Sequence, residues 1–493
     1  MGMGWLAFSL FISLLFFFFS LRRRREENLP PGPRGWPIVG NIFQLGSKPH
    51  AALASLARTH GPLISLRLGT QRVVVASSPS AASLVLKTHD HSLSYRALPQ
   101  GGKFPEYANH SLVWADCTDS WKQLRTICRT QLFSRKMVDD GANLRQQKVE
   151  EMVGRLRSTE GKATNVAEVV FDTIFDMLAS CIFSEDAEAA LGSVTKMKGL
   201  TRKLIGFVTK PNVSDYFPVV AGIDIQGIRR KSRAYTLQVY EVWEGILAKR
   251  KEQRGDGAVM VKDNDFLDVL LSSGFSDLQI KAVLLDMFFA GTDTTTTTVE
   301  WAMAALVKQP EVMTKLRREL SDALCCTSRA DSTMYEKLRD LRYLQACIKE
   351  SMRLYPPVPL LLPHRASETC PVLGYTIPKG CQVLVNLWAI GRDPTTWDDP
   401  LAFRPERFSD SPNLDFKGAD YELIPFGSGR RMCAGLPLAV RTLELILAAL
   451  VHNFEWSLPY SADLGQLGME EKFGLTLQRE QPLQLIPKFI EHK

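Results

Sequence analysis

The most apolar segment of the chain lies at its N-terminus, over Gly4–Leu21. Fourteen of these 18 residues are apolar, and the others are glycine or serine. A helix of this length is about 27 Å long, close to the hydrocarbon thickness of the endoplasmic reticulum membrane. Four arginines, Arg22–Arg25, follow at once, and the positive-inside rule then puts the rest of the chain in the cytosol. We expect a transmembrane anchor over residues 4–21. A cleaved signal peptide is the alternative, but its positive charge would precede the apolar run.

Residues 22–41 are predicted to form a basic and proline-rich linker. The stretch Leu29–Asn41 holds four prolines and three glycines in 13 residues. Proline fixes the backbone and removes a hydrogen-bond donor, so this connector should be stiff, extended and non-helical. Residues 42–493 show no internal repeat and no strong boundary, and we expect a single catalytic domain there.

Within this domain helical periodicity predominates, and two short regions have a β pattern. Leu63–Leu68 and Val73–Ala76 are apolar runs separated by Gly69-Thr70, which predicts a hairpin. The second β region covers Tyr375–Leu387, and residues 137–349 are mainly helical in pattern. The predicted fold class is mainly α (α+β), a helix-rich domain with small β-sheets.

Composition and charge narrow the function. The 493 residues are 45% apolar and 23% charged, with a net charge of +7, which is typical of a globular protein. The arginine cluster at residues 22–27 accounts for +2, and no basic stripe with interleaved aromatic residues follows, so no nucleic-acid partner is expected. The nine cysteines form no C-x-x-C pair, which argues against disulfides and structural zinc.

One cysteine, Cys433, lies in an unusual loop. The segment Pro425–Gly435 contains three glycines and two arginines, and an apolar helical run, Leu436–Val451, starts directly after it. A sulfur at a helix N-terminus is stabilised as a thiolate by the helix dipole and by unpaired N–H groups. This pattern suits a metal ligand. A glycine-rich turn with an incidental buried cysteine is the alternative.

A long helix is predicted over Ser276–Gln309. Ser276 and Gln279 form a capping box, and Pro310 marks the end. Its middle contains Gly291, Asp293 and a run of threonines, whose hydroxyls can bond back to helix carbonyls and bend the helix. The interpretation is a widened turn beside a ligand, with an acid and an alcohol in a proton relay, or else a kink with a solvated aspartate.

Two further pairs share helix faces. Glu350 and Arg353 stand at i and i+3 and could form an ion pair, with Arg407 as a second guanidinium downstream. Trp121 and Arg125 stand at i and i+4 and could both donate hydrogen bonds to a carboxylate. Taken alone, each pair could equally be a surface feature.

Together these segments resemble the cytochrome P450 family, the haem-thiolate monooxygenases, in its plant microsomal form. The resemblance covers the whole chain: the anchor, the proline-rich hinge, W-x-x-x-R at Trp121, A-G-x-D-T at Ala290, E-x-x-R at Glu350, P-E-R-F at Pro405 and F-x-x-G-x-R-x-C-x-G at Phe426. It implies haem b (iron protoporphyrin IX), O2, and NADPH electrons delivered by NADPH–cytochrome P450 reductase. It also implies a single-pass protein of the endoplasmic reticulum membrane with a cytosolic catalytic domain.

The resemblance also implies roles for single residues. Cys433 would be the axial ligand of the iron, and its thiolate would favour O–O cleavage. Asp293 and Thr294 would deliver protons during oxygen activation, and Ala290 and Gly291 would leave room for the oxygen molecule. The haem propionates would be held by Trp121, Arg125, Arg431, His364 and Arg365. Glu350, Arg353 and Arg407 would form a buried ion-pair core that supports the cysteine loop.

For the substrate, the resemblance points to a small lipophilic plant metabolite. The branch that includes the benzylisoquinoline alkaloid oxidases is favoured, which implies hydroxylation or phenol coupling, and a neighbouring branch that oxidises monoterpenoids is the alternative. A haem-thiolate isomerase or lyase is a remote alternative, because such relatives usually lack the acid–alcohol pair. By analogy the substrate contacts fall in five mostly apolar windows: Arg96–Trp114, Arg202–Pro211, Leu284–Phe289, Val358–Pro363 and Glu470–Thr476.

Overall fold

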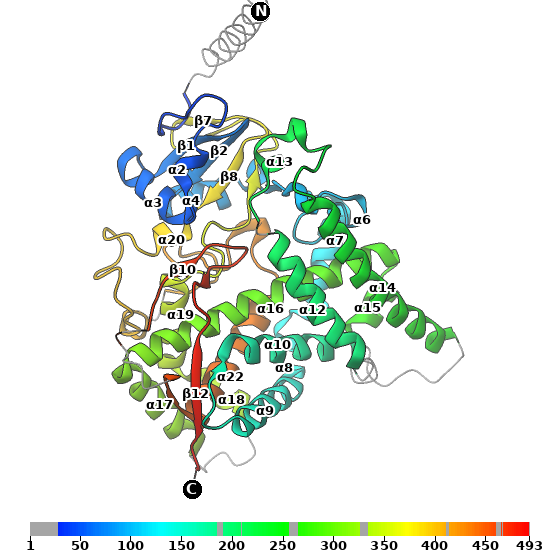
Figure 1. Cartoon of the computed structure of the whole chain (residues 1–493), viewed down its shortest axis with the longest axis vertical. Helices are drawn as coiled ribbons and strands as arrows, with labels where there is room; N and C mark the ends of the chain where they lie inside the picture. The colour runs from blue at the N-terminus through cyan, green and yellow to red at the C-terminus, as the bar shows by residue number, and fades with distance from the viewer. Residues whose placement is uncertain are drawn as a thin grey trace, which may run out of the picture.

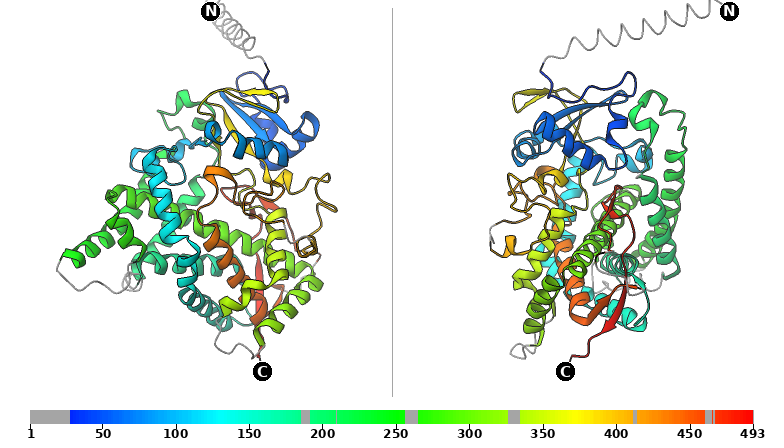
Figure 2. Two further views of the ribbon diagram at one scale, coloured as in Figure 1. Left: turned by 180° about the vertical axis from the view of Figure 1, so that it is seen from behind. Right: turned by 60° about the vertical axis from the view of Figure 1, so that its left-hand side comes forward.

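The computed structural model describes residues 28–184, 191–208, 210–255, 265–325, 334–410, 414–459, 465 and 467–492. The expected anchor, residues 4–21, and the basic part of the linker lie outside these residues. In Figures 1 and 2 a small sheet lies at one end of a larger body of helices, at the same end as the start of the described chain. The predicted mainly α class with small sheets is confirmed.

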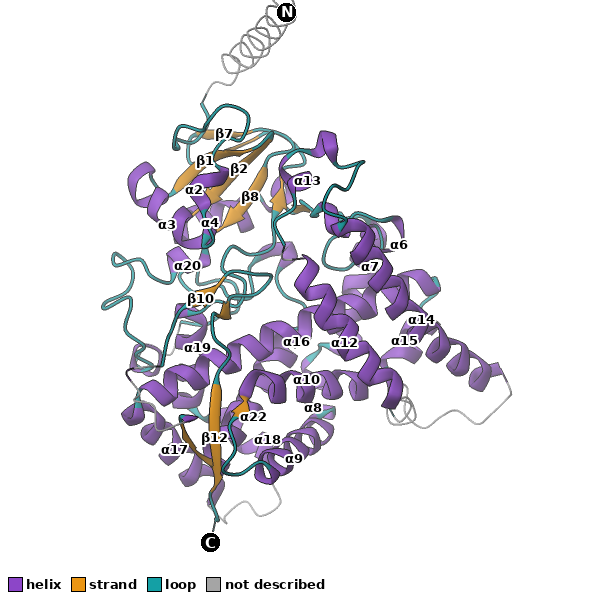
Figure 3. Cartoon of the chain, in the orientation of Figure 1, coloured by secondary structure: helices purple, strands orange, loops and turns teal. Residues whose placement is uncertain are grey.

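The largest sheet has five strands in the order β1-β2-β8-β5-β3 (Figure 3). The predicted hairpin is present as β1 (Leu63–Leu68) and β2 (Gln71–Ala76), with Gly69 at a φ of 62° in the turn. The second predicted β region divides between two sheets. Its first part, β7 (Tyr375–Ile377), pairs with β6 (Cys370–Val372), whereas β8 (Gln382–Val385) runs parallel to β2.

Two very short strands complete this sheet and lie close to the site described below. They are β3 (Tyr95–Arg96) and β5 (His364–Arg365), which pair antiparallel. The remaining strands form a C-terminal sheet, β4-β12-β9 (Thr164–Asn165, Gln484–Phe489 and Phe454–Ser457), and a separate hairpin, β10-β11 (Glu471–Lys472 and Gln478–Arg479).

The helices supply most of the body. Those longer than six residues are α3 (Pro49–His60), α7 (Asp119–Ile127), α9 (Ala142–Ser158), α10 (Val166–Phe183), α12 (Leu191–Val208), α14 (Ile228–Gly255), α15 (Phe266–Ser272), α16 (Asp277–Lys308), α17 (Pro310–Cys325), α19 (Arg342–Leu354) and α22 (Leu436–Asn453). The short ones are α2 (Ile42–Leu45), α4 (Pro79–Ser83), α5 (Asp90–Leu93), α6 (Pro105–Ala108), α8 (Arg135–Asp140), α13 (Val213–Tyr216), α18 (Met334–Lys337), α20 (Leu387–Ile390) and α21 (Glu406–Ser409).

The long helix α16 crosses the middle of the body (Figure 1). It begins and ends where the sequence predicts, because Ser276 and Gln279 form the capping box and Gln309 is the C-terminal cap. Its 32 residues span about 48 Å. The predicted back-bonding is also present, since Thr294 Oγ1 donates to the Ala290 carbonyl at 2.7 Å.

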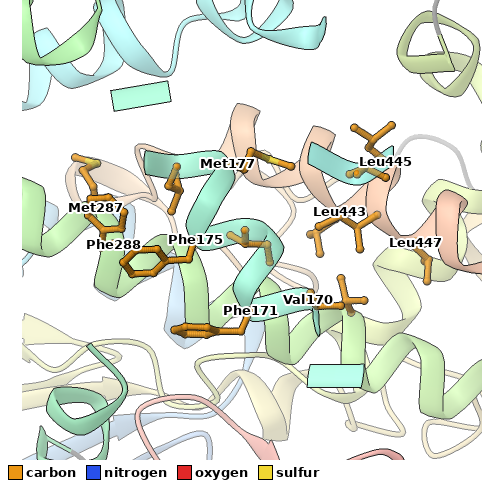
Figure 4. Packing of buried hydrophobic residues seen from close by; sticks show 14 of the residues in the cluster. Val170, Phe171, Phe175, Met177, Met287, Phe288, Leu443, Leu445 and Leu447 are labelled. Carbon is orange, nitrogen blue, oxygen red and sulfur yellow. The ribbon is translucent and has the colours of Figure 1, made fainter. Parts of the chain in front are cut away.

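Helices α10, α16 and α22 pack against one another around the main core, as Figure 4 shows. The Phe175 and Phe288 rings, one from α10 and one from α16, lie 4.7 Å apart between centroids. Among the described residues, α22 alone is long and apolar enough to cross a membrane, but 67% of it is buried in the protein. Its hydropathy therefore reflects its place in the core.

The predicted ion-pair core is confirmed as a buried network on α19. The Glu350 carboxylate accepts from Arg353 Nε at 2.7 Å and from Arg407 Nε at 3.0 Å. The Arg353 guanidinium also donates to the carbonyls of Pro400 at 2.7 Å and Ala402 at 3.0 Å. The network thus ties α19 to the irregular segment 391–405 and to α21, which precede the cysteine loop in the chain.

Candidate active site

The loop before Cys433 has a tight backbone conformation that depends on glycine at two positions. Gly427 and Gly429 have φ values of 71° and 68°, which are accessible to glycine and unfavourable for most other residues. A Cβ on Gly429 would lie 2.1 Å from the Leu86 carbonyl oxygen, so no side chain fits there. The Cys433 N–H donates to the Phe426 carbonyl at 2.9 Å. The loop is therefore closed on itself directly before α22 begins.

The surroundings of Cys433 act on its charge in opposite directions. Burial raises the pKa of the thiol, whereas the backbone N–H groups of Gly435 and Leu436 and the charge of Arg125 lower it. The sulfur has exposed surface, but this surface faces an internal cavity whose wall it forms. Burial has the largest effect, so the pKa of Cys433 is raised overall, and the two N–H groups and Arg125 partly offset the cost of an anionic sulfur facing the cavity.

This cavity, here called the thiolate cavity, has a volume of about 270 Å³. The cysteine loop forms one wall, and Ala290, Gly291 and Thr294 of α16 contribute to its lining. A Cβ on Gly291 would come within 2.8 Å of Leu178 Cδ1, so glycine permits close packing of α10 against α16 there. The structure therefore brings the predicted small residues and the cysteine to the same space.

Four basic side chains line the thiolate cavity: Arg96, Arg125, His364 and Arg431. Arg431 donates from Nε to Ser94 O at 2.8 Å and from Nη2 to Ala115 O at 2.6 Å. Arg96 donates from Nη1 to Leu362 O at 2.7 Å. Arg431 Nη1 and Arg96 Nε are buried and have no partner. Unpaired buried guanidinium donors are costly, so these two atoms indicate a site for an anionic group.

The environment of these groups supports that interpretation. Burial and the neighbouring charge of Arg431 lower the pKa of Arg96 to about 9. Burial also lowers the pKa of His364 well below its ordinary value, and Arg96 adds to that effect. The His364 Nδ1 atom lies 2.7 Å from the Leu93 carbonyl, which sets the orientation of the ring. A carboxylate placed among these groups would offset the repulsion between them.

The structure places Arg365 away from the cavity and puts Arg96 there instead. Arg365 forms an ion pair with Asp116 at 3.0 Å near the surface. Strands β3 and β5 pair Arg96 with His364 and Tyr95 with Arg365. Because neighbouring residues of a strand point to opposite faces, Arg96 and His364 share the cavity face and Arg365 lies on the other. The two-residue strand β3 leaves no periodicity in the sequence from which Arg96 could be identified.

Trp121 occupies a supporting position rather than the cavity wall. Its indole N–H donates to the Leu112 carbonyl at 2.8 Å, so its donor is already used. Its ring lies under the Arg431 guanidinium, 4.3 Å from the guanidinium carbon to the ring centroid. Arg125, one turn further along α7, donates to the Met432 carbonyl of the cysteine loop. Trp121 therefore orients Arg431 instead of contacting the cavity itself.

The acid–alcohol pair divides between two spaces. Thr294 lines the thiolate cavity and also the second cavity described below, whereas Asp293 lines only the second, where its carboxylate is turned toward the hairpin loop before β11. There it accepts from Thr476 Oγ1 at 2.6 Å and from Gln478 Nε2 at 3.4 Å. Burial raises the pKa of Asp293, and these two hydrogen bonds partly counteract the shift.

A second cavity of about 110 Å³, here called the distal pocket, adjoins the thiolate cavity. Both are lined by Val113, Asp286, Ala290, Thr294, Val358 and Leu362. All five predicted substrate windows contribute to the distal pocket, with Phe104, Leu204, Phe289, Leu362 and Leu475 among its apolar members. Ser232 and Thr236 of α14 also line it and were missed, because a lone hydroxyl in an amphipathic helix gives no signal.

Asp286 is an ionisable group at the junction of the two cavities. Its carboxylate accepts from Tyr107 Oη at 2.6 Å, from Ser111 Oγ at 2.8 Å and from the Val113 N–H at 3.2 Å. These donors fasten segment 107–113 to α16. Burial raises the pKa of Asp286 to about 6, although the hydrogen bonds oppose the shift.

Comparisons with known proteins agree with this geometry. A model of the cytochrome P450 family matches residues 30–485. The chain is 49% identical to a probable (S)-N-methylcoclaurine 3'-hydroxylase isozyme of Coptis japonica, over 97% of each chain. It is 45% identical to the corytuberine synthase of the same plant, over 94% of each chain, and 40% identical to the geraniol 8-hydroxylase of Catharanthus roseus, over 98% of each chain.

Proposed function

The chain belongs to the cytochrome P450 family, and we propose that it oxidises a benzylisoquinoline-type alkaloid by hydroxylation or phenol coupling. As a member of this family it is a monooxygenase that uses haem, O2 and NADPH electrons supplied by a reductase. The observation that carries the substrate proposal is the distal pocket, which has aromatic walls and two carboxylates, Asp286 and Asp293, and none of the described residues that line it is basic.

The residues around the thiolate cavity fit a haem. Cys433 would supply the thiolate ligand, and the unpaired donors of Arg96 and Arg431 suit the carboxylates of the porphyrin. Arg125 and His364 would complete that anionic site. When bound, the haem supplies the oxidising chemistry by activating O2 for reaction with the substrate.

The protein's own groups then have separate tasks. The N–H groups of Gly435 and Leu436 and the charge of Arg125 would favour the anionic sulfur of Cys433 against the effect of burial, and Gly291 allows α10 to pack closely against α16 beside the cavity. The Thr294 hydroxyl, anchored to the Ala290 carbonyl, stands where it can pass a proton into the cavity. Asp293, held by Thr476, would resupply that proton from behind α16. The presence of this acid–alcohol pair supports a monooxygenase over the remote alternative of an isomerase or lyase.

The alkaloid assignment rests on charge as well as on similarity. Benzylisoquinoline alkaloids combine aromatic rings with an amine that is protonated near neutral pH, and two carboxylates without a basic neighbour favour a cation. The alternative is a monoterpenoid such as geraniol, which the geraniol 8-hydroxylase relative and the apolar walls support. Such a molecule is neutral, so it would form no ion pair with Asp286 or Asp293.

Product analysis separates these alternatives. Microsomes containing the protein and its reductase would be given NADPH with several benzylisoquinolines or with geraniol, and Cys433→Ala microsomes would serve as the control. We expect alkaloid products that depend on both NADPH and Cys433. Turnover of geraniol alone would favour the terpenoid alternative, and turnover of a hydroperoxide without NADPH would favour the isomerase.

We further propose attachment to the endoplasmic reticulum membrane through residues 4–21, with residues 22–41 as the linker and 42–493 as the cytosolic catalytic domain. Exposed apolar side chains near the start of the described chain support this orientation. They are Trp36, Ile38, Phe43, Val219, Ile223 and Ile225. Their two segments lie together, because the β1–β2 turn bonds both of them, with Gly69 N–H donating to Val39 O and Thr70 N–H donating to Tyr216 O. A chain lacking residues 1–27 should keep partial membrane binding, which replacing Phe43 and Val219 by serine should abolish in flotation assays.

A reductase would meet the face that carries the cysteine loop. Helix α7 is joined to this loop through Arg125, and exposed cations lie on and after α7, namely Lys122, Arg129, Arg135 and Lys136. Arg430 belongs to the loop itself. Part of this charge is balanced within the chain, because Lys122 pairs with Asp119 at 2.8 Å and Arg430 with Asp90 at 3.0 Å. Such a patch favours an acidic partner and makes its association dependent on salt. Charge reversal at Lys122 and Arg129 should slow reduction by the reductase without altering the spectrum of the haem.

A further inference from the structure

Ser232 has a buried hydroxyl group with no hydrogen-bond partner among the described residues. It lies on α14, its residue is 2% exposed, and its Oγ has no hydrogen-bond partner. A serine inside a helix can bond back to a carbonyl of the preceding turn, but Ser232 does not do so. Because an unpaired buried hydroxyl is costly, the position calls for a partner from outside the chain.

Ser232 is one of the residues that form the wall of the distal pocket. Ser232 and Thr236, one turn apart on α14, both line the pocket. The neighbouring wall is Gly101, where an added Cβ would lie 3.9 Å from Ser232 Oγ. Glycine therefore places less cover over the hydroxyl from segment 98–102 than a residue with a side chain would.

The position relative to the thiolate cavity shows which part of a ligand would reach Ser232. The two cavities adjoin through Ala290 and Thr294, which line both. Ser232 lines only the distal pocket, whereas Cys433 lines only the thiolate cavity. A two-ring substrate with one ring beside Thr294 would thus extend its other ring toward Ser232.

We propose that Ser232 is a specificity-determining residue that hydrogen-bonds a phenolic hydroxyl on the ring remote from the site of oxidation. This inference rests on the proposed alkaloid function and deepens it. The other described residues of the pocket wall are apolar, acidic or hydroxyl-bearing, and none of them is basic, so a neutral, hydroxylated ring attached to a cationic amine complements them, whereas an anionic ligand does not. A site that pairs a substrate hydroxyl rejects the analogue without it, because its own polar group is then left unpaired.

The test compares two benzylisoquinolines that differ only in this remote hydroxyl. Their dissociation constants would be measured with the haem-loaded protein from the spectral shift on binding, for the wild type, Ser232→Ala and Ser214→Ala. Ser214 is the matched control, since its hydroxyl is also buried and unpaired but lines neither cavity. The reduced-CO spectrum would establish that each variant holds its haem in the native way.

We expect Ser232→Ala to bind the hydroxylated compound about 3- to 10-fold more weakly, which is the typical range for one neutral hydrogen bond. Binding of the analogue without the hydroxyl should change by less than about twofold, and Ser214→Ala should change neither. Equal weakening of both compounds, or no weakening of either, would overturn the assignment. If neither compound binds to the wild-type protein, the alkaloid function is refuted, and the role of Ser232 with it.

Discussion

Replacing Glu350 by glutamine tests whether the buried ion-pair network holds the fold around the cysteine loop. The substitution keeps the volume of the side chain but removes its charge and turns one of its two oxygens into a donor. Glu350 and Arg353 side chains are both 0% exposed, and that of Arg407 is 7% exposed. Two guanidinium groups would therefore lose their only carboxylate partner within the network while remaining shielded from water.

The size of the effect follows from the contacts. The carboxylate accepts four hydrogen bonds, at 2.7 and 2.8 Å from Arg353, 3.0 Å from Arg407 Nε and 2.7 Å from the Arg404 N–H. Bonds to charged groups contribute about 1.5–3 kcal/mol each, but they are not additive within one network. Breaking a buried pair typically costs about 3–5 kcal/mol. We expect a loss in this range, because the Arg353 bonds to Pro400 and Ala402 survive.

The assay follows the thiolate-type reduced-CO spectrum of the haem-loaded protein across a urea series. Glu455→Gln is the matched control, because its partner Lys488 lies 3.2 Å away and the two side chains are 57% and 72% exposed. An exposed pair contributes less than about 1 kcal/mol, so this variant should have nearly the wild-type midpoint. If the midpoint of Glu350→Gln shifts no further than that of Glu455→Gln, the network does not stabilise the loop and the reasoning fails.

Four other predictions address single groups. Cys433→Ala should abolish the thiolate-type reduced-CO spectrum, and a retained spectrum would contradict the assignment of Cys433 as the ligand. Thr294→Ala should retain haem but release reducing equivalents as peroxide, measured as peroxide formed per NADPH consumed. Thr296→Ala is the control and should not release peroxide, because Thr296 lines neither cavity. Equal peroxide yields in the two variants would remove Thr294 from the proton relay. Arg96→Gln should lower haem retention during dialysis much more than Arg365→Gln, since only Arg96 lines the thiolate cavity, and the reverse order would restore Arg365 to the site. Burial raises the pKa of Asp286 from 3.8 to about 6, so the folded state binds this proton more tightly than the unfolded chain. The stability from this group is therefore lost as the pH rises through about 6, by about 1 kcal/mol between about pH 5 and pH 7. In Asp286→Asn this loss of stability between about pH 5 and pH 7 should disappear, as measured by urea midpoints at both pH values. If the pH dependence of the variant equals that of the wild type, Asp286 does not titrate in this range.

Features that depend on neighbouring residues in the chain could be predicted from the sequence. The cysteine loop is one, because its glycines and the helix start at Leu436 act on Cys433 within a few residues. The capping box of α16, its threonine back-bonds and the β1–β2 hairpin are others, since each is closed by contacts between residues close in sequence. The family resemblance rests on these local motifs, and so do the haem ligand and the class of reaction.

Positions set by long-range pairing were decided only by the tertiary structure. His364 and Arg365 are adjacent in one strand, and side chains alternate along a strand, so only one of them can face the cavity. Pairing of this strand with β3 places His364 on the cavity side together with Arg96, which lies about 270 residues earlier in the chain. Trp121 matches its motif, yet the Leu112 carbonyl uses its donor and leaves it beneath Arg431. The proposed contact of Ser232 with the substrate depends on the packing of α14 against Gly101 and on the distal pocket that α14 forms together with α16. Sequence specifies which chemical groups are present and how they behave locally, whereas the packing of distant segments determines which of them share a cavity and which are left without a partner.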